Sequence, residues 1–125
     1  MIFKLRYTAI QVQDLDRSID FYTHVLGMRL TSRIKVPETR GEFAIVRSGG
    51  SDHYLEINWY ENQQYRPGDE LDHIAFEVMD LDATIHELST MGIKPVSPLK
   101  ESPSSKWAYI KDPDGIWIEI FQKKQ

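Results

Sequence analysis

Apolar and polar residues follow the same order of patterns in both halves of the chain. Residues 3–13 alternate at period two, which is typical of a β-strand with two different faces. Apolar residues then recur at the spacing of a helix, at Leu15, Ile19, Tyr22 and Leu26. Strand-forming runs follow at about 28–35, 42–48 and 53–60. The first half is therefore predicted to contain a strand, a helix and three strands.

The second half repeats this order after a polar connector at residues 61–70. An alternating run ends at Val78, and apolar residues at helical spacing follow at Leu81, Ile85, Leu88 and Met91. Strand-like runs then lie near 93–97, 106–111 and 116–121, with a Ser- and Pro-rich loop predicted at 97–105. The pattern predicts two βαβββ modules, 3–60 and 71–121, and an α+β fold in a single domain covering residues 1–125.

Fixed offsets between equivalent residues indicate an internal repeat. An offset of 66 pairs Asp14 with Asp80, and each aspartate is predicted to cap the helix that follows it. An offset of 63 pairs Glu56 with Glu119 near the end of each module. The two copies are expected to lie around a pseudo-twofold axis, with a curved, mostly antiparallel sheet forming a cleft.

The last predicted strand holds a glutamate in an unusual setting. Asp-Pro-Asp-Gly at 112–115 is a strong turn sequence, because proline presets φ and glycine allows positive φ. Alternate residues of the strand share a face, so Trp117, Glu119 and Phe121 lie together, opposite three isoleucines. One such glutamate suits a solvent-facing edge position. A second, Glu56, in the equivalent strand favours a shared role.

The repeat also relates Tyr7 to His73 through the offset of 66. Both are predicted to lie on the sheet face turned away from the helices, where small alanines beside them leave room for a cavity. Tyr7, Glu56, His73 and Glu119 are therefore predicted to converge across the pseudo-twofold axis. An imidazole nitrogen and carboxylate oxygens together suit a divalent first-row metal ion. The alternative is two unrelated surface glutamates and a hydrogen-bonded histidine.

The other three histidines are weaker candidates for ligands. His24 and His86 fall in the predicted helices and are expected to face solvent. His53 is one strand position from Tyr54, so it is expected to point away from Glu56.

Composition narrows the range of functions. The chain has 125 residues, a formal net charge of −4 and no cysteine. An acidic balance without a basic run argues against nucleic-acid binding, and the lack of cysteine removes disulfides and thiolate metal sites. No apolar run approaches membrane-spanning length, and the first dozen residues lack the apolar core of a leader sequence. We expect a soluble, cytoplasmic protein that does not bind nucleic acid or span a membrane.

The motifs resemble those of the vicinal oxygen chelate superfamily, which includes glyoxalase I, methylmalonyl-CoA epimerase, extradiol dioxygenases and bleomycin resistance proteins. The resemblance covers essentially the whole chain and is nearest to glyoxalase I. It implies the glyoxalase/bleomycin resistance/dioxygenase fold. The segments that carry it are 14–22, 26–28, 55–57, 72–78 and 112–120.

The resemblance implies a metal-ligand set at Tyr7, Glu56, His73 and Glu119 that binds one divalent ion, Zn, Ni, Mn or Fe. Glyoxalase I usually has histidine at the position of Tyr7, so this chain has one nitrogen ligand fewer. The phenol either binds the metal or hydrogen-bonds a water beside it. Glyoxalase I also holds glutathione with an arginine at the position of Gln11.

By this resemblance the protein is expected to be a metal-dependent lyase or isomerase of the glyoxalase I type, similar to lactoylglutathione lyase, or a related epimerase. Its expected substrate is a small molecule with adjacent oxygens. Glu119 is expected to move a proton next to a carbonyl, with Glu56 sharing the task, while the metal stabilises an enediolate. The family implies a homodimer whose active sites are shared between subunits. Substrate contacts are assigned to Asn58, Trp117, Phe121 and Gln11.

Two other functions are open on the sequence. A metal-free drug-binding protein of the bleomycin resistance type does not need aligned metal ligands, so Glu56, His73 and Glu119 count against it. An extradiol dioxygenase-like enzyme needs two histidines and one carboxylate, and Tyr7 replaces the first histidine.

Overall fold

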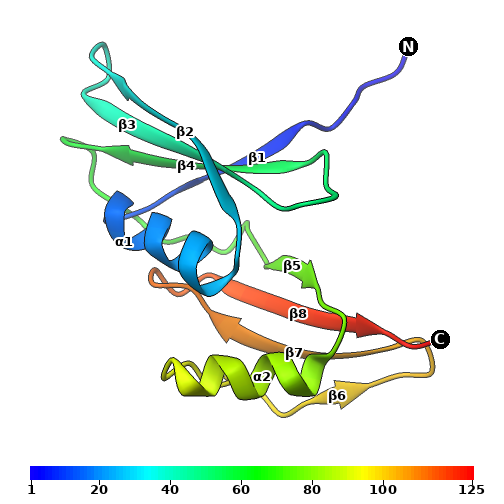
Figure 1. Ribbon diagram of the computed structural model, residues 1–125. Coiled ribbons are helices and arrows are strands. Elements are labelled where there is room, and N and C mark those ends of the chain that lie inside the picture. The colour runs from blue at the N-terminus through cyan, green and yellow to red at the C-terminus, as the bar shows by residue number, and fades with distance from the viewer. The chain divides into compact units, whose positions relative to one another are not determined.

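The chain folds into two compact units, Met1–Pro67 and Gly68–Gln125, in a computed structural model that describes all 125 residues (Figure 1). The elements of the first unit are β1 (Tyr7–Gln11), α1 (Leu15–Asp20), the π-helix η1 (Phe21–Val25), β2 (Arg29–Val36), β3 (Gly41–Arg47) and β4 (Tyr54–Tyr60). Those of the second are β5 (Ile74–Glu77), α2 (Leu81–Thr90), β6 (Lys100–Glu101), β7 (Ser105–Lys111) and β8 (Trp117–Lys123). The predicted α+β fold of paired βαβββ modules is confirmed. The single-domain organisation and the cleft stay predictions.

The first unit is a four-stranded sheet in the order β1-β4-β3-β2, with β1 parallel to β4 and the other pairs antiparallel. Helix α1 contacts β3 and β4, so alternate strand residues are buried on that face. Burying each large apolar side chain contributes roughly 2 kcal/mol. The buried apolar residues of this unit are Ile10, Val12, Leu15, Ile19, Phe21, Tyr22, Met28, Ala44, Val46, Leu55 and Ile57.

The second unit repeats this arrangement in the order β5-β8-β7-β6, with β5 parallel to β8. Helix α2 lies along one face of its sheet and contacts β8 (Figure 1). Of the three isoleucines predicted to share a face of the last strand, Ile118 and Ile120 are buried on this side, while Ile116 precedes the strand. The rest of the core is Leu81, Leu88, Ala108 and Ile110.

Both helices begin at the predicted caps. The Asp14 carboxylate accepts a hydrogen bond from the Arg17 amide, and the Asp80 carboxylate accepts one from the Ala83 amide, each at 3.0 Å. The first helix then changes to π-type hydrogen bonding after Asp20, as in the Leu26 N–H to Phe21 carbonyl bond of 3.1 Å. The apolar spacing alone does not predict this change.

Several predicted boundaries are wrong. The first strand begins at Tyr7 rather than residue 3, and of residues 3–6 only Arg6 bonds to β4, through its carbonyl and the Tyr54 amide at 3.3 Å. No strand forms at 93–97: Pro95 has no N–H to donate, and only Val96 bonds to β7, through the Tyr109 carbonyl at 2.8 Å. The edge strand β6 lies instead inside the stretch 97–105 that was predicted to be a loop. Met91, predicted to be part of the helical stripe, is 47% exposed.

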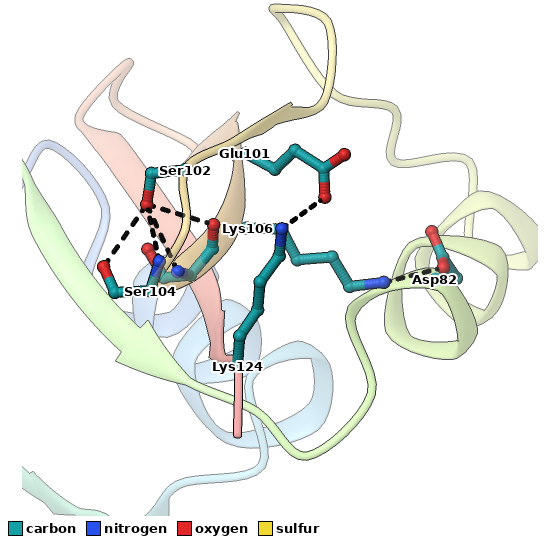
Figure 2. A network of polar contacts seen from close by, with 7 residues as sticks. Asp82, Glu101, Ser102, Ser104, Lys106 and Lys124 are labelled. Atoms are coloured by element: carbon teal, nitrogen blue, oxygen red, sulfur yellow. Dashed lines mark hydrogen bonds and ion pairs between the residues drawn. The ribbon is translucent and has the colours of Figure 1, made fainter.

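Polar contacts fix the β6 edge of the second unit (Figure 2). Lys106 of β7 pairs with Asp82 of α2 at 3.0 Å, and Lys124 pairs with Glu101 of β6 at 2.8 Å. The hydrogen bond from Lys124 lowers the pKa of Glu101 below its ordinary value. These pairs join the helix and the chain end to the sheet, on the face that carries α2. Neither helix of the protein has the length and apolar character needed to cross a membrane.

Candidate functional site

The turn before β8 sets the position of Glu119. The buried carboxylate of Asp112 accepts hydrogen bonds from the Asp114 and Ile116 amides at 2.9 and 2.8 Å. Gly115 has φ of 88°, which a side chain would strain. The predicted Asp-Pro-Asp-Gly turn is confirmed, and it starts β8 in the register that pairs Ala75 with Glu119.

In the second unit, Glu119 and His73 come together on the sheet face away from α2. The Glu119 Oε2 atom lies 3.4 Å from His73 Nε2, and His73 Nδ1 lies 2.7 Å from Asp72 Oδ1. Because an ionised carboxylate only accepts hydrogen bonds, we assign the proton of a neutral His73 to Nδ1. The lone pair of Nε2 then faces the Glu119 carboxylate, whose side chain is only 22% exposed.

Aromatic rings surround this pair. Tyr109 is the register partner of Glu119 on β7, and its ring contacts His73 edge to face with 5.6 Å between centroids. Tyr109 also contacts Trp117, at 5.4 Å. Burial, followed by the negative charges of Glu119 and Asp72, raises the pKa of Tyr109 above 10.0. The phenol therefore stays protonated across the physiological range.

In the first unit, Glu56 occupies the equivalent position with different neighbours. Its register partners are Ala9 of β1 and Ile45 of β3, and it forms no hydrogen bond or ion pair within its unit. Tyr7 is stacked on Tyr54, with centroids 4.9 Å apart and an interplanar angle of 13°. Tyr7 and Glu56 are the equivalents of His73 and Glu119. They are separated in this unit, because the Tyr7 ring is stacked on Tyr54 of the neighbouring strand.

The residues assigned to substrate binding lie on these same two faces. Gln11 and Asn58 are direct register partners across β1 and β4, one alternate position beyond Ala9 and Glu56. Phe121 pairs in register with Glu77 and Trp107, one alternate position beyond Glu119.

The donor atoms of the second unit fit a metal ion. Two ligands of a tetrahedral ion at about 2.1 Å lie roughly 3.4 Å apart, which matches the separation of His73 Nε2 and Glu119 Oε2. A carboxylate bonded to the distal imidazole nitrogen, as Asp72 is, also typically orients a histidine ligand. Neither unit by itself gathers three or more candidate ligands.

Sequence reasoning missed three residues on these faces. Asp72 orients His73, Tyr109 lies beside Glu119, and Arg47 lies 4.1 Å above the centre of the Tyr54 ring. Tyr109 could have been found from the sequence, because it alternates with Trp107 in a strand that was predicted and so shares a face with it. Arg47 carried no signal, because stacking on a ring of another strand depends on sheet register.

The remaining histidines are placed as predicted. His24 and His86 are exposed on the helices. His53 Nε2 lies 2.9 Å from Thr8 Oγ1, a residue on the face of the sheet opposite Glu56.

Two surface hollows are lined by none of the predicted site residues. One of ≈ 290 Å³ lies between the ends of β2 and β3 and the end of β4, beside Arg40 and Trp59. The other, of ≈ 800 Å³, lies at the end of β8, beside Lys106 and Lys124. Each is lined by both acidic and basic side chains, so neither has a charge that selects a ligand.

A family model described as the Glyoxalase/Bleomycin resistance protein/Dioxygenase superfamily matches residues 4–120. The chain belongs to this superfamily. A lactoylglutathione lyase of Neisseria meningitidis serogroup A is 35% identical over 128 residues, which cover 97% of this chain and 91% of that protein. The superfamily predicted from the sequence is therefore confirmed.

Solved structures agree with this assignment. A glyoxalase I of Leishmania major, described as trypanothione-dependent, is 30% identical with a TM-score of 0.81, over 97% of this chain and 87% of that one. TnmS3, an antibiotic binding protein of Streptomyces sp. CB03234, has a TM-score of 0.80 over 98% of each chain. At 24% identity, that second likeness shows the fold alone. The similarities together support a glyoxalase I-like lyase.

Proposed function

We propose that the protein is a metal-dependent lyase of the glyoxalase I type that converts the hemithioacetal of a 2-oxoaldehyde into a 2-hydroxyacyl thioester. The observation that carries this proposal is Glu119, half-buried and 3.4 Å from a histidine that Asp72 orients. The similarity to lactoylglutathione lyases supports the choice of reaction.

The reaction moves hydrogen between two neighbouring carbons. A C–H bond breaks at the carbon that carries the thiol sulfur and the hydroxyl group, and a C–H bond forms at the former carbonyl carbon. The hydroxyl oxygen loses its proton and becomes the thioester carbonyl, and the former carbonyl oxygen gains a proton. The first carbon is oxidised and the second reduced, so no external oxidant is needed.

Glu119 is the group that takes the proton from the first carbon and returns it to the second. Glu56, its counterpart in the repeat, shares this proton transfer. Trp117 and Phe121 lie on either side of Glu119 along β8 and keep water from the reacting carbons.

His73 Nε2 and the Glu119 carboxylate are proposed to hold one divalent ion together with Glu56. A bound ion supplies Lewis-acid stabilisation of negative charge on the two adjacent oxygens. Glu56 comes either from the same chain or, in a homodimer with shared sites, from the partner subunit. Two carboxylates and one imidazole favour ions content with oxygen ligands, such as Mn²⁺, Fe²⁺ or Zn²⁺. Tyr7 is assigned to hold water beside the ion rather than to bind it.

The test is thioester formation from methylglyoxal and glutathione by protein purified without chelator and supplied with Zn²⁺, Mn²⁺, Ni²⁺ or Fe²⁺. We expect turnover with at least one ion, and a loss of about 100-fold or more in kcat for Glu119→Gln. Glu101→Gln is the matched control, because it removes the same charge from the opposite face of the same sheet. Full activity in Glu119→Gln, or no thioester with any ion or thiol, contradicts the proposal.

A metal-free ligand-binding protein is the second candidate. The observation in its favour is a carboxylate beside aromatic rings, Glu119 with Tyr109 and Trp117, which suits a cationic ligand. Titration of the apoprotein with bleomycin, followed by tryptophan fluorescence, tests it. Tight binding that is unaffected by added metal, in a protein without thioester-forming activity, favours this function over the lyase.

A further inference from the structure

Tyr109 of β7 stands directly opposite Glu119 of β8, on the sheet face that carries His73. Its ring contacts His73 and Trp117, with 5.6 and 5.4 Å between the ring centroids. Strand β8 lies between β7 and β5 in the sheet, and His73 directly precedes β5. A ring that starts on β7 and touches His73 must therefore lie over β8, the strand that carries Glu119.

The Tyr109 hydroxyl is available to a ligand. Its ring makes aromatic contacts, but the hydroxyl forms no hydrogen bond within the second unit. A buried side-chain atom without a partner occurs only at His53 Nδ1, so the Tyr109 oxygen is not closed off from solvent. Trp107 and Lys111, its neighbours along the same face of β7, lie opposite other residues. Tyr109 is thus the one side-chain donor of β7 directly opposite Glu119.

The repeat indicates that the fold does not require a hydroxyl at this position. An offset of 64 relates Tyr109 to Ile45, which stands opposite Glu56 in the first unit. Isoleucine fills the same place in the strand without any polar atom. A hydroxyl opposite the glutamate is therefore present only in the copy whose glutamate also meets a histidine. This difference favours a role in chemistry over a role in packing.

The proposed reaction creates negative charge close to this hydroxyl. Residues opposed on an antiparallel pair have Cβ atoms about 5 Å apart, so Tyr109 and Glu119 address the same small volume. The substrate carbon that gives its proton to Glu119 lies in that volume, and the carbonyl oxygen is attached to the next carbon. Negative charge collects on this oxygen as the proton leaves. A donor that is already oriented stabilises such charge without further rearrangement.

We propose that Tyr109 donates a hydrogen bond from its hydroxyl to the carbonyl oxygen of the substrate, on which this negative charge develops. The inference rests on the proposed function, since it names a further catalytic residue for that reaction. The phenol keeps its proton throughout, so the balance of the reaction is unchanged. Glu119 moves the carbon proton, while Tyr109 stabilises the charge on the neighbouring oxygen.

Tyr109→Phe tests the donor, because it removes the hydroxyl and keeps the ring that contacts His73 and Trp117. We expect kcat for thioester formation from methylglyoxal and glutathione to fall by about 10- to 100-fold, while KM changes by less than about threefold. Tyr60→Phe is the matched control, the same change at the end of β4, and is expected to keep both values within about twofold. A kcat in Tyr109→Phe equal to that of the control overturns the proposal.

A binding measurement separates this inference from the proposed function. Acetohydroxamate carries adjacent oxygens with a negative charge, as the reacting substrate does, but it cannot undergo the reaction. Calorimetry gives its affinity for the wild type, Tyr109→Phe and Tyr60→Phe, each supplied with Zn²⁺. We expect a loss of about 10-fold or more in Tyr109→Phe alone, because a hydrogen bond to a charged oxygen is lost. The affinity for Zn²⁺ itself is expected to stay the same in all three.

Weaker hydroxamate binding with unchanged zinc affinity supports Tyr109 as the donor even in a protein that forms no thioester. Equal hydroxamate affinity in Tyr109→Phe and Tyr60→Phe overturns the inference, and so does a wild type that binds no hydroxamate. A parallel loss of zinc affinity in Tyr109→Phe also overturns it, since the residue would then support His73 rather than the substrate.

Discussion

The two units share strand order and register but surround their glutamates with different chemistry. Glu119 faces a histidine that a carboxylate orients, whereas Glu56 has only Ala9 and Ile45 as register partners. The ring equivalent to His73 is Tyr7, and it is stacked on Tyr54. The same backbone fold thus places two neighbouring donor groups, His73 and Glu119, in the second unit. In the first unit it places the single carboxylate of Glu56 beside the stacked rings of Tyr7 and Tyr54.

The difference follows from what each ring can bond. An imidazole has two nitrogen atoms, so His73 can donate a hydrogen bond to Asp72 from one and present the lone pair of the other beside Glu119. A phenol has one polar atom and a larger apolar surface, so Tyr7 gains most by stacking. The repeat therefore preserves the strand order and register, while the change from histidine to tyrosine alters the local chemistry. His73 leaves a nitrogen available as a metal ligand beside Glu119, whereas Tyr7 makes an aromatic contact with Tyr54.

The largest expected effect comes from the equivalent positions His73 and Tyr7. We predict that His73→Ala lowers affinity for Zn²⁺ and Mn²⁺ by about 100-fold or more, because it removes the only nitrogen donor of the proposed ligand set. Tyr7→Phe keeps the stack and is expected to change affinity by only a few-fold. Calorimetric titration of the apoproteins measures both. Affinity equal to the wild type in His73→Ala shows that the proposed metal site is wrong, and a large loss in Tyr7→Phe shows that the phenol is a ligand.

An intermediate effect is expected one residue earlier in each copy, at Asp72 and its equivalent Arg6. Asp72→Asn weakens the hydrogen bond to His73 Nδ1 and is predicted to lower metal affinity by roughly 10- to 100-fold. Arg6→Gln serves as the control, since no polar contact of its side chain is seen within the first unit. Competition for zinc with a chromogenic chelator gives the two affinities. Equal affinities would mean that the orientation of His73 does not depend on Asp72.

The smallest effect concerns Tyr109, whose equivalent beside Glu56 is Ile45. The pKa of Tyr109 is raised, so the unfolded chain loses this proton near pH 10 while the folded chain keeps it. The free energy of unfolding therefore falls as pH rises through that range, and the loss is small because the ring is only partly buried. Tyr109→Phe removes this contribution.

Urea unfolding at about pH 8 and about pH 10.5 compares the wild type with Tyr109→Phe. The wild type should lose slightly more free energy of unfolding between the two conditions. Ile45→Val in the first unit is the control, because it adds and removes no titrating group. A loss in Tyr109→Phe as large as in the wild type contradicts the shifted pKa.

Much of the fold could be predicted from the sequence because its signals are local. Aspartate caps, the Asp-Pro-Asp-Gly turn and the alternation of isoleucines depend on residues close together in the chain. The repeat offsets likewise placed Glu56 and Glu119 at equivalent strand positions. The strand predicted at 93–97 shows the limit: it does not form, because Pro95 suited the apolar pattern but had no N–H for a partner strand.

Tertiary structure alone decided how side chains meet across strands. The stack of Arg47, Tyr54 and Tyr7 joins three strands, and the contacts of His73 with Glu119 and Tyr109 join segments 36 or more residues apart. Such contacts depend on sheet register, and register is set by the whole hydrophobic pattern and the turns rather than by the residues that touch. The sequence by itself determined the two modules, their faces and the candidate carboxylates. The tertiary structure decided that Glu119 has a histidine neighbour and that Glu56 does not, because neighbours on different segments are set only when the sheet forms.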